Sequence, residues 1–198
     1  MKYFKIWLDH KFVHEHGNVF PVIPGIYKND ATVFRLCANY HDITFKEFLL
    51  ITGNAEKLYM KNHTIKYENG KVVPFEDIVA NLPKLKSLDY YSDGMDFTPD
   101  SANKLMEISH FKNMSHLSLY DIPETLDVAK MFDFMVANKH LKVNLCYIRQ
   151  VSDQFKILLK KYSQMLKKEK NCTSTITPFS DFLDASFLLS SSSEDDEW

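Results

Sequence analysis

A short pattern of hydrophobic and polar positions recurs along the middle of the chain, in the order apolar-x-x-apolar-x-apolar, and it predicts buried strands. The three clearest copies are Ala55, Leu58 and Met60; Leu85, Leu88 and Tyr90; and Met114, Leu117 and Leu119. Their central positions lie about 29 to 30 residues apart, at or just beyond the period of leucine-rich repeats. A fourth copy has Val143 and Leu145, with His140 where an apolar residue is expected, and we interpret residues 33–37 as a degenerate first copy.

Segments with the hydrophobic period of an α-helix follow these strands. The first has its apolar face at Phe75, Ile78, Val79 and Leu82. The second is predicted to begin with Thr98 as N-cap and Pro99 at the first helical position. The remaining apolar faces are Ala102, Leu105 and Met106; then Phe132, Met135 and Val136; and then Phe155, Leu158, Leu159, Tyr162 and Leu166.

Three further helix starts are predicted from polar side chains. Asp127 and Ser152 are N-cap candidates for the last two helices, and Thr44 with Glu47 has the spacing of a capping box. The fold class is therefore predicted as α/β. One strand–helix unit cannot bury its own apolar face, so neighbouring units must share a core. We expect a short leucine-rich-repeat-like solenoid of strand–helix units with a parallel sheet, and a doubly wound open sheet is the alternative.

The chain divides into three predicted regions. Residues 1–26 are an N-terminal extension, expected to be partly ordered, residues 27–170 form the repeat-like α/β domain, and residues 171–198 form a flexible serine-rich and acidic tail. Within the tail, Ser191, Ser192 and Ser193 each have an acidic residue three positions later, the spacing that acid-directed kinases favour. We predict phosphorylation at these serines, with the lysines of residues 160–170 as the counter-charge for the added phosphates, and a solubilising tail with no regulatory role is the alternative.

The residues between the buried strand positions are the candidate binding residues. In a solenoid these side chains lie on the concave face, and tyrosines beside polar groups suit an interface because they combine large area with a polar tip. The predicted partner-binding residues are Tyr59, Asp89, Tyr91, His116, Ser118, Tyr120 and Asn144. The alternative is that Tyr59 and Tyr91 pack under loops.

Composition narrows the class of partner. The net charge of −2 at pH 7 argues against a dedicated nucleic-acid binder, because such proteins carry a strongly basic face. The five lysines of residues 160–170 favour weak binding of nucleic acid or phosphate as an alternative function, although lysines also suit the C-terminal end of a helix. We find neither a signal peptide nor an apolar run long enough for a membrane span, and expect a location in the cytoplasm or nucleus.

Motifs for metal binding and catalysis are not apparent in the sequence. Cys37, Cys146 and Cys172 have neither disulfide-framework nor zinc-site spacing. His10 and His14 would share one face if the segment were helical, and His16 lies close by, but we see no further ligands and predict no metal and no cofactor. The sequence has no nucleophile elbow, glycine-rich phosphate loop or zinc-protease motif, so we predict no catalytic residues and a protein that is not an enzyme.

Several short segments of the sequence resemble segments found in members of a large nematode protein family. They are Tyr27-Lys28-Asn29-Asp30, Ile51-Thr52-Gly53-Asn54-Ala55-Glu56-Lys57-Leu58-Tyr59, Ile65-Lys66-Tyr67, Ile108-Ser109-His110-Phe111, Ile122-Pro123-Glu124 with Asp127, and Asn138-Lys139. The family is that of the nematode F-box C and F-box-associated proteins, and the resemblance covers roughly residues 27–168. It implies the substrate-recognition region of a ubiquitin-ligase substrate adaptor.

The segment before residue 27 departs from this family. In family members an F-box docks on the Skp1 adaptor, but no such element is recognised there. We therefore expect a protein-interaction module that recruits substrates without itself binding a Skp1-type adaptor. A truncated paralogue with no role in a ligase is the alternative.

Overall fold

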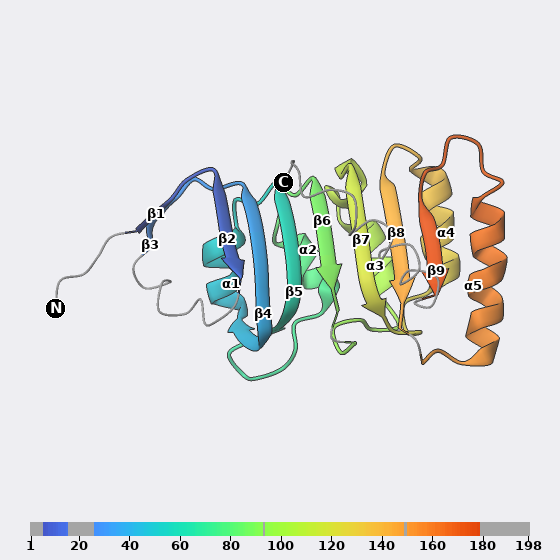
Figure 1. Cartoon of the computed structure of the whole chain (residues 1–198), viewed down its shortest axis with the longest axis horizontal. Coiled ribbons are helices and arrows are strands. Elements are labelled where there is room, and N and C mark those ends of the chain that lie inside the picture. The colour runs from blue at the N-terminus through green and yellow to red at the C-terminus, as the bar shows by residue number, and fades with distance from the viewer. Residues whose placement is uncertain (1–5, 16–25, 93, 149, 179–198) are drawn as a thin grey trace.

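The computed structural model describes residues 6–15, 26–92, 94–148 and 150–178, and is built on a seven-stranded sheet (Figure 1). Every neighbouring pair of strands in this sheet is parallel. The strands, in spatial order, are β2 (Lys11–Glu15), β4 (Val33–Thr44), β5 (Lys57–Lys66), β6 (Ser87–Tyr91), β7 (His116–Ile122), β8 (Lys142–Tyr147) and β9 (Thr175–Pro178). A second, two-stranded sheet pairs β1 (Ile6–Leu8) with β3 (Ile26–Asn29).

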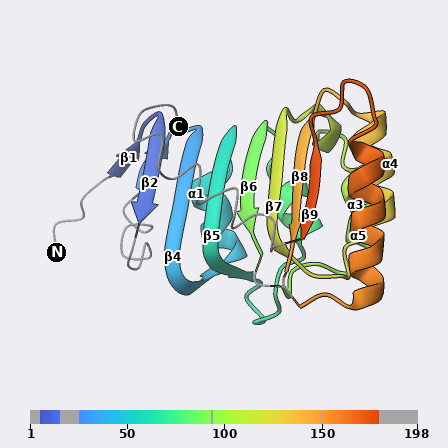
Figure 2. The same cartoon turned by 45° about the vertical axis from the view of Figure 1, so that its right-hand side comes forward.

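The helices cover one face of the large sheet. They are α1 (Phe45–Thr52), α2 (Phe75–Ala80), α3 (Ser101–Glu107), α4 (Val128–Ala137) and α5 (Asp153–Leu166), with a 3-10 turn η2 (Phe111–Asn113). In Figure 1, α1 to α4 lie behind the strands, and Figure 2 shows α4 next to α5, which stands at the end of the row beside β9. We call the opposite face of the sheet, which is turned toward the viewer in Figure 1, the front face.

The strands are stacked in the order and register that the repeat predicts. Leu58, Leu88, Leu117 and Val143 lie directly opposite one another on adjacent strands, and each is at most 2% exposed. The backbone bonds before the strands repeat as well, because the Glu56 carbonyl accepts the amides of residues 86 and 87, and the Lys86 carbonyl those of residues 115 and 116. The predicted α/β class with a parallel sheet is therefore confirmed.

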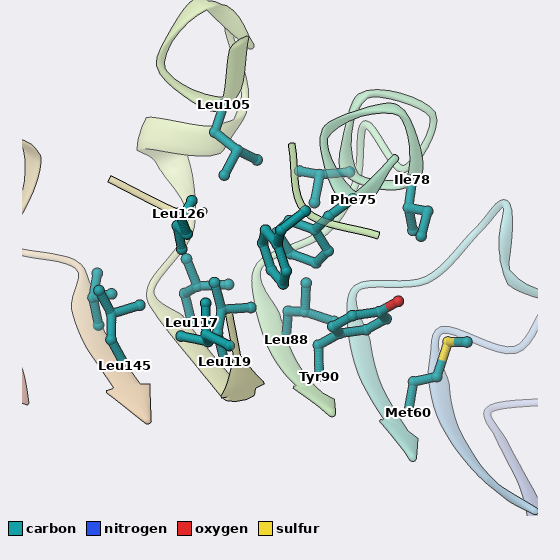
Figure 3. Close-up of a cluster of buried hydrophobic side chains, with 14 of the residues drawn as sticks. Met60, Phe75, Ile78, Leu88, Tyr90, Leu105, Leu117, Leu119, Leu126 and Leu145 are labelled. Carbon is teal, nitrogen blue, oxygen red and sulfur yellow. The ribbon is translucent and has the colours of Figure 1, made fainter. Parts of the chain in front are cut away.

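The buried core lies between the sheet and the helices (Figure 3). Side chains from the strands, such as Leu88, Leu117 and Leu119, point toward Phe75 and Leu105 on the helical side. The Phe75 ring lies 4.9 Å from the ring of Tyr90, measured between centroids. Because strand side chains alternate between faces, the residues between these core positions lie on the front face.

Helix starts follow the predicted caps with one exception. Thr44 and Glu47 form the capping box, Asp127 Oδ1 accepts the amides of residues 129 and 130, and Ser152 Oγ accepts the amide of residue 155. The predicted start at Thr98 and Pro99 is wrong, since α3 begins at Ser101. The Thr98 amide instead donates to Ser101 Oγ at 2.8 Å, so the two preceding residues belong to a turn.

Two apolar residues of the predicted helix faces are exposed. Met106 is 37% exposed and Leu158 is 41% exposed, so their predicted burial is wrong. Each directly neighbours a residue that is at most 1% exposed, Leu105 and Leu159 respectively, and a step of one residue turns a helix by about 100°. The apolar stripes of α3 and α5 are therefore narrower than expected.

The sheet extends beyond the predicted repeat region on both sides. β2 lies ahead of residue 27 and pairs with β4. β9 lies after residue 170 and pairs with β8. Ile176 of β9 lies opposite Leu145 and is 1% exposed, so this strand continues the second buried row, which runs through Met60, Tyr90, Leu119 and Leu145.

Candidate partner-binding face

All seven predicted binding residues lie on the front face, on the adjacent strands β5 to β8. Tyr59, Asp89, Ser118 and Asn144 are direct register partners, and the same row continues to Arg35 on β4 and Thr175 on β9. Tyr91 lies opposite Tyr120, and His116 opposite Ser87. The equal register of the repeats thus brings residues from distant parts of the chain into continuous rows.

Aromatic rings and cations follow one another across four strands of this face. We call Arg35, Tyr59, Lys61, Tyr91 and Tyr120 the aromatic row. The Tyr91 and Tyr120 rings are stacked, with centroids 4.3 Å apart and planes inclined by 14°, and the Tyr59 and Tyr91 centroids are 5.7 Å apart. Arg35 Cζ lies 4.2 Å from the Tyr59 centroid, and Lys61 Nζ lies 4.8 Å from that of Tyr91. These are cation–π distances.

The tyrosines of the aromatic row are half-buried. This burial raises the pKa of Tyr59, Tyr91 and Tyr120 above the ordinary value of the phenol. A side-chain hydrogen bond joins Tyr59 and Tyr91, and a further bond joins Tyr120 to Ser118. The hydroxyl groups therefore stay protonated, and the stacking holds the rings in place.

A chain of polar side chains runs beside the aromatic row, and we call Asp89, His116, Ser118, Asn144 and Thr175 the polar row. Asp89 Oδ1 lies 3.2 Å from His116 Nε2, which is also 3.0 Å from Ser118 Oγ. Asn144 Nδ2 donates to Ser118 Oγ at 2.9 Å, and Thr175 Oγ1 donates to Asn144 Oδ1 at 3.0 Å. Since Asp89 is 6% and Ser118 1% exposed, these bonds compensate for lost hydration.

The aspartate, histidine and serine of the polar row do not have the geometry of a catalytic triad. In a triad the carboxylate binds Nδ1 of the histidine, which leaves Nε2 free to take the serine proton. Here Asp89 and Ser118 both meet Nε2 of His116. A proton that Nε2 donates to Asp89 blocks the same atom from acting as the base for Ser118, so the arrangement fixes side chains rather than activating a nucleophile.

A pocket of about 310 Å³ adjoins the aromatic row at the carboxyl ends of the central strands. Tyr91 forms part of its wall together with Ser92, Asp121 and Ile148. Asp121 and Asn62, also in the wall, have φ values of 56° and 60°, a left-handed conformation that Asn and Asp adopt more readily than most residues. The pocket offers room for a side chain of a segment that contacts Tyr91.

The other residues considered in the sequence do not form a site in the described part of the chain. Among the described residues, no group of three or more His, Cys, Asp or Glu side chains could hold a metal ion. The helical spacing assumed for His10 and His14 is wrong, because His14 lies in strand β2 and His10 has a φ of 50°. His16 and the predicted phosphorylation sites Ser191, Ser192 and Ser193 lie outside the described residues.

Three contributors to the face were missed in the sequence: Arg35, Lys61 and Thr175. Strand alternation could have placed Lys61 on the front face, since it follows Tyr59 by two residues. Arg35 could have been placed in the same way from the degenerate first copy, but Thr175 belongs to a strand that the repeat pattern did not identify.

No protein-family model, curated protein or solved structure matches this chain. None of the helices described has the length and the apolar character that crossing a membrane requires.

Proposed function

We propose that this chain is a protein-interaction module whose front face binds an extended segment of a partner protein. The observation that carries the proposal is the aromatic row, in which three tyrosines and two cations contact one another across strands β4 to β7. Tyrosine and arginine are enriched among the residues that dominate binding energy at interfaces. Because stacking already orders these side chains, they lose less conformational entropy when a partner binds to them.

The proposed architecture is a short leucine-rich-repeat-like solenoid. The sequential order of the strands, the aligned buried residues and the repeated backbone bonds before each strand support it. Stacked repeats present extended binding surfaces formed by equivalent positions of successive units. The rows of the front face are such positions, with Tyr59, Asp89, Ser118 and Asn144 at one position of each unit.

The biological role that we propose follows the resemblance to nematode F-box-associated proteins. The front face would hold a protein in the cytoplasm or nucleus for substrate recruitment to a ubiquitin ligase. A Skp1-type adaptor is not the proposed partner of this face.

Site-specific photo-crosslinking in cells tests this function. A photoreactive amino acid at Lys57 or Lys142, both exposed and both at strand starts in the register row of His116, should crosslink the same protein. The same probe at Asn103, exposed on α3, should not. The product should be lost when Tyr91→Ala and Tyr120→Ala are combined.

A matched substitution separates lost contacts from lost folding. Tyr67→Ala removes a partly buried tyrosine that packs on Phe45 of α1, away from the aromatic row, and should leave the crosslink intact. The Tyr91→Ala/Tyr120→Ala variant should keep nearly the same melting temperature. An undiminished crosslink in that variant would refute the proposal, and a large loss of stability would place the two tyrosines among the core residues.

A further inference from the structure

The front face carries more positive charge than the chain as a whole, and this points to the chemistry of its partner. We infer that the bound segment is acidic and extended, and that it crosses strands β4 to β8 with carboxylates directed at Arg35, Lys61 and Lys142. This inference rests on the proposed function and specifies the partner of the same face.

The cations of the front face differ from several lysines elsewhere on the described surface, which pair with carboxylates. Among the described residues, no carboxylate forms a salt bridge with Lys57, Lys61 or Lys142, and Asp121 acts on Lys61 only from beyond salt-bridge distance. Elsewhere, Lys66 pairs with Asp42 at 2.6 Å, Lys86 with Glu56 at 2.7 Å and Lys139 with Glu169 at 3.1 Å. The net charge of the chain is −2, so a general excess of lysine does not explain this patch.

The nearby acids are withdrawn from the surface. Asp89 is 6% exposed, and its carboxylate contacts His116 rather than a front-face lysine. Asp121, beside the aromatic row, is partly buried, and this burial raises the pKa of its carboxyl while the charge of Lys61 opposes the shift. The exposed Lys57 and Lys142 therefore project positive charge from the face, while the nearest carboxylates are buried or partly buried, and this charge attracts an anionic partner.

The dimensions of the rows fit a short extended peptide. Adjacent strands are about 4.8 Å apart, so the distance from Arg35 on β4 to Asn144 on β8 is about 19 Å. An extended chain advances about 3.3 Å per residue, and about six residues span this distance. The donors along the path are the guanidinium of Arg35, the ammonium groups, the tyrosine hydroxyls and the Asn144 amide, all suited to carboxylate oxygens.

The stacking of the tyrosines favours a peptide over a single-stranded nucleic acid. Nucleobases bind such surfaces by stacking on free aromatic faces. In this row, Tyr91 and Tyr120 cover each other, and Arg35 and Lys61 lie over the faces of Tyr59 and Tyr91. Each ring of the row therefore has a face that is already covered by a neighbour, which leaves less aromatic surface for a base to stack on.

A peptide pair that differs only in charge provides the test. The first probe is a fluorescein-labelled peptide with the acidic sequence of residues 191–198, and the second carries Gln and Asn in place of its four acids. Fluorescence anisotropy with the full chain at low salt should show binding of the acidic peptide and at least tenfold weaker binding of the amide peptide. Added salt should weaken the acidic complex.

Two lysine pairs give the matched variants. Lys61→Met with Lys142→Met removes two front-face charges and should weaken the acidic peptide about four- to twenty-fivefold, as two surface ion pairs of about two- to fivefold each. Lys167→Met with Lys168→Met removes the same charge from exposed residues that follow α5, and should change the affinity less than twofold. Neutralising Glu194 to Glu197 in the chain tests the same chemistry, since tighter peptide binding would show that its own acids compete for the face.

Each failure has a distinct meaning. Equal affinity for the amide peptide, equal losses in both lysine pairs, or tighter binding of a single-stranded oligonucleotide would overturn the acidic partner. The proposed function would survive these results if crosslinks from Lys57 and Lys142 still depended on Tyr91 and Tyr120. If the unmutated face gives no crosslink at Lys57 or Lys142 while peptide binding stays intact and depends on Lys61, the proposed partner protein is overturned. The preference of the face for negative charge would still stand.

Discussion

Replacing Leu88 by alanine is the sharpest test of the stacked-repeat core. Leu88 is 0% exposed and lies between Leu58 and Leu117, its register partners on the two adjacent strands. The change removes three carbon atoms, worth about 2.4 kcal/mol at about 0.8 kcal/mol for each buried group. The sheet cannot close over the gap without breaking its register, so a cavity term adds to this loss. We expect a total of about 3 to 5 kcal/mol.

Urea denaturation at 25 °C, followed by far-UV circular dichroism, measures this loss. The matched control is Leu50→Ala on α1, where the side chain is 52% exposed and the expected change is below about 0.5 kcal/mol. The slope of the transition should stay the same in both variants. A loss below about 1 kcal/mol for Leu88→Ala, with an unchanged slope, would refute the reasoning that the buried row of Leu58, Leu88, Leu117 and Val143 forms the core.

Two further predictions follow from shifted pKa values. Burial raises the pKa of the Cys146 thiol to about 11, so at pH 8 only about one molecule in a thousand carries the thiolate there. Mass spectrometry should therefore find Cys146 alkylated by iodoacetamide only after unfolding. Labelling of Cys146 as fast as that of Cys172 would contradict this prediction. Lost hydration and the hydrogen bond to Asp77 raise the pKa of Tyr67 from 10.0 to about 12. Between these two pH values the folded state keeps a proton that the unfolded state releases. The free energy of unfolding should therefore fall as pH rises from 10 to 12. Urea denaturation across this range should show a smaller fall for Tyr67→Phe, and an identical fall would contradict the assignment.

The sheet could be predicted from the sequence because its signal is repeated. A single apolar-x-x-apolar-x-apolar segment is ambiguous, but the copies centred on Leu58, Leu88 and Leu117 specify both strand and register together. The N-caps Asp127 and Ser152 were equally local, since each cap bonds to amides two or three residues later. Features that depend on a few neighbouring residues, or on a repeat, could therefore be predicted from the hydrophobic and polar pattern of the sequence.

The limits of prediction arose where tertiary contacts decide. Met106 and Leu158 are apolar and lie near the buried stripe of their helices, yet the sheet covers only the neighbouring positions Leu105 and Leu159. Strand β9 carries a weak pattern, and its place depends on pairing with β8 across about thirty residues. The bonds of His116 could not be foreseen either, because they depend on which ring nitrogen faces Asp89.

The composition of the rows gives the front face a direction. Along the register row, Arg35 and Tyr59 occupy β4 and β5, whereas Ser118, Asn144 and Thr175 occupy β7 to β9. Neighbouring strands lie close enough for such side chains to contact each other, so each chemical type continues into the next unit. A partner segment that crosses the sheet along this row therefore meets a cationic and aromatic end and an end rich in hydroxyl and amide groups, beside which Lys142 of β8 adds one charge. Two opposite orientations of the segment would differ in energy, and this difference would let a surface built from repeated units select one sequence direction.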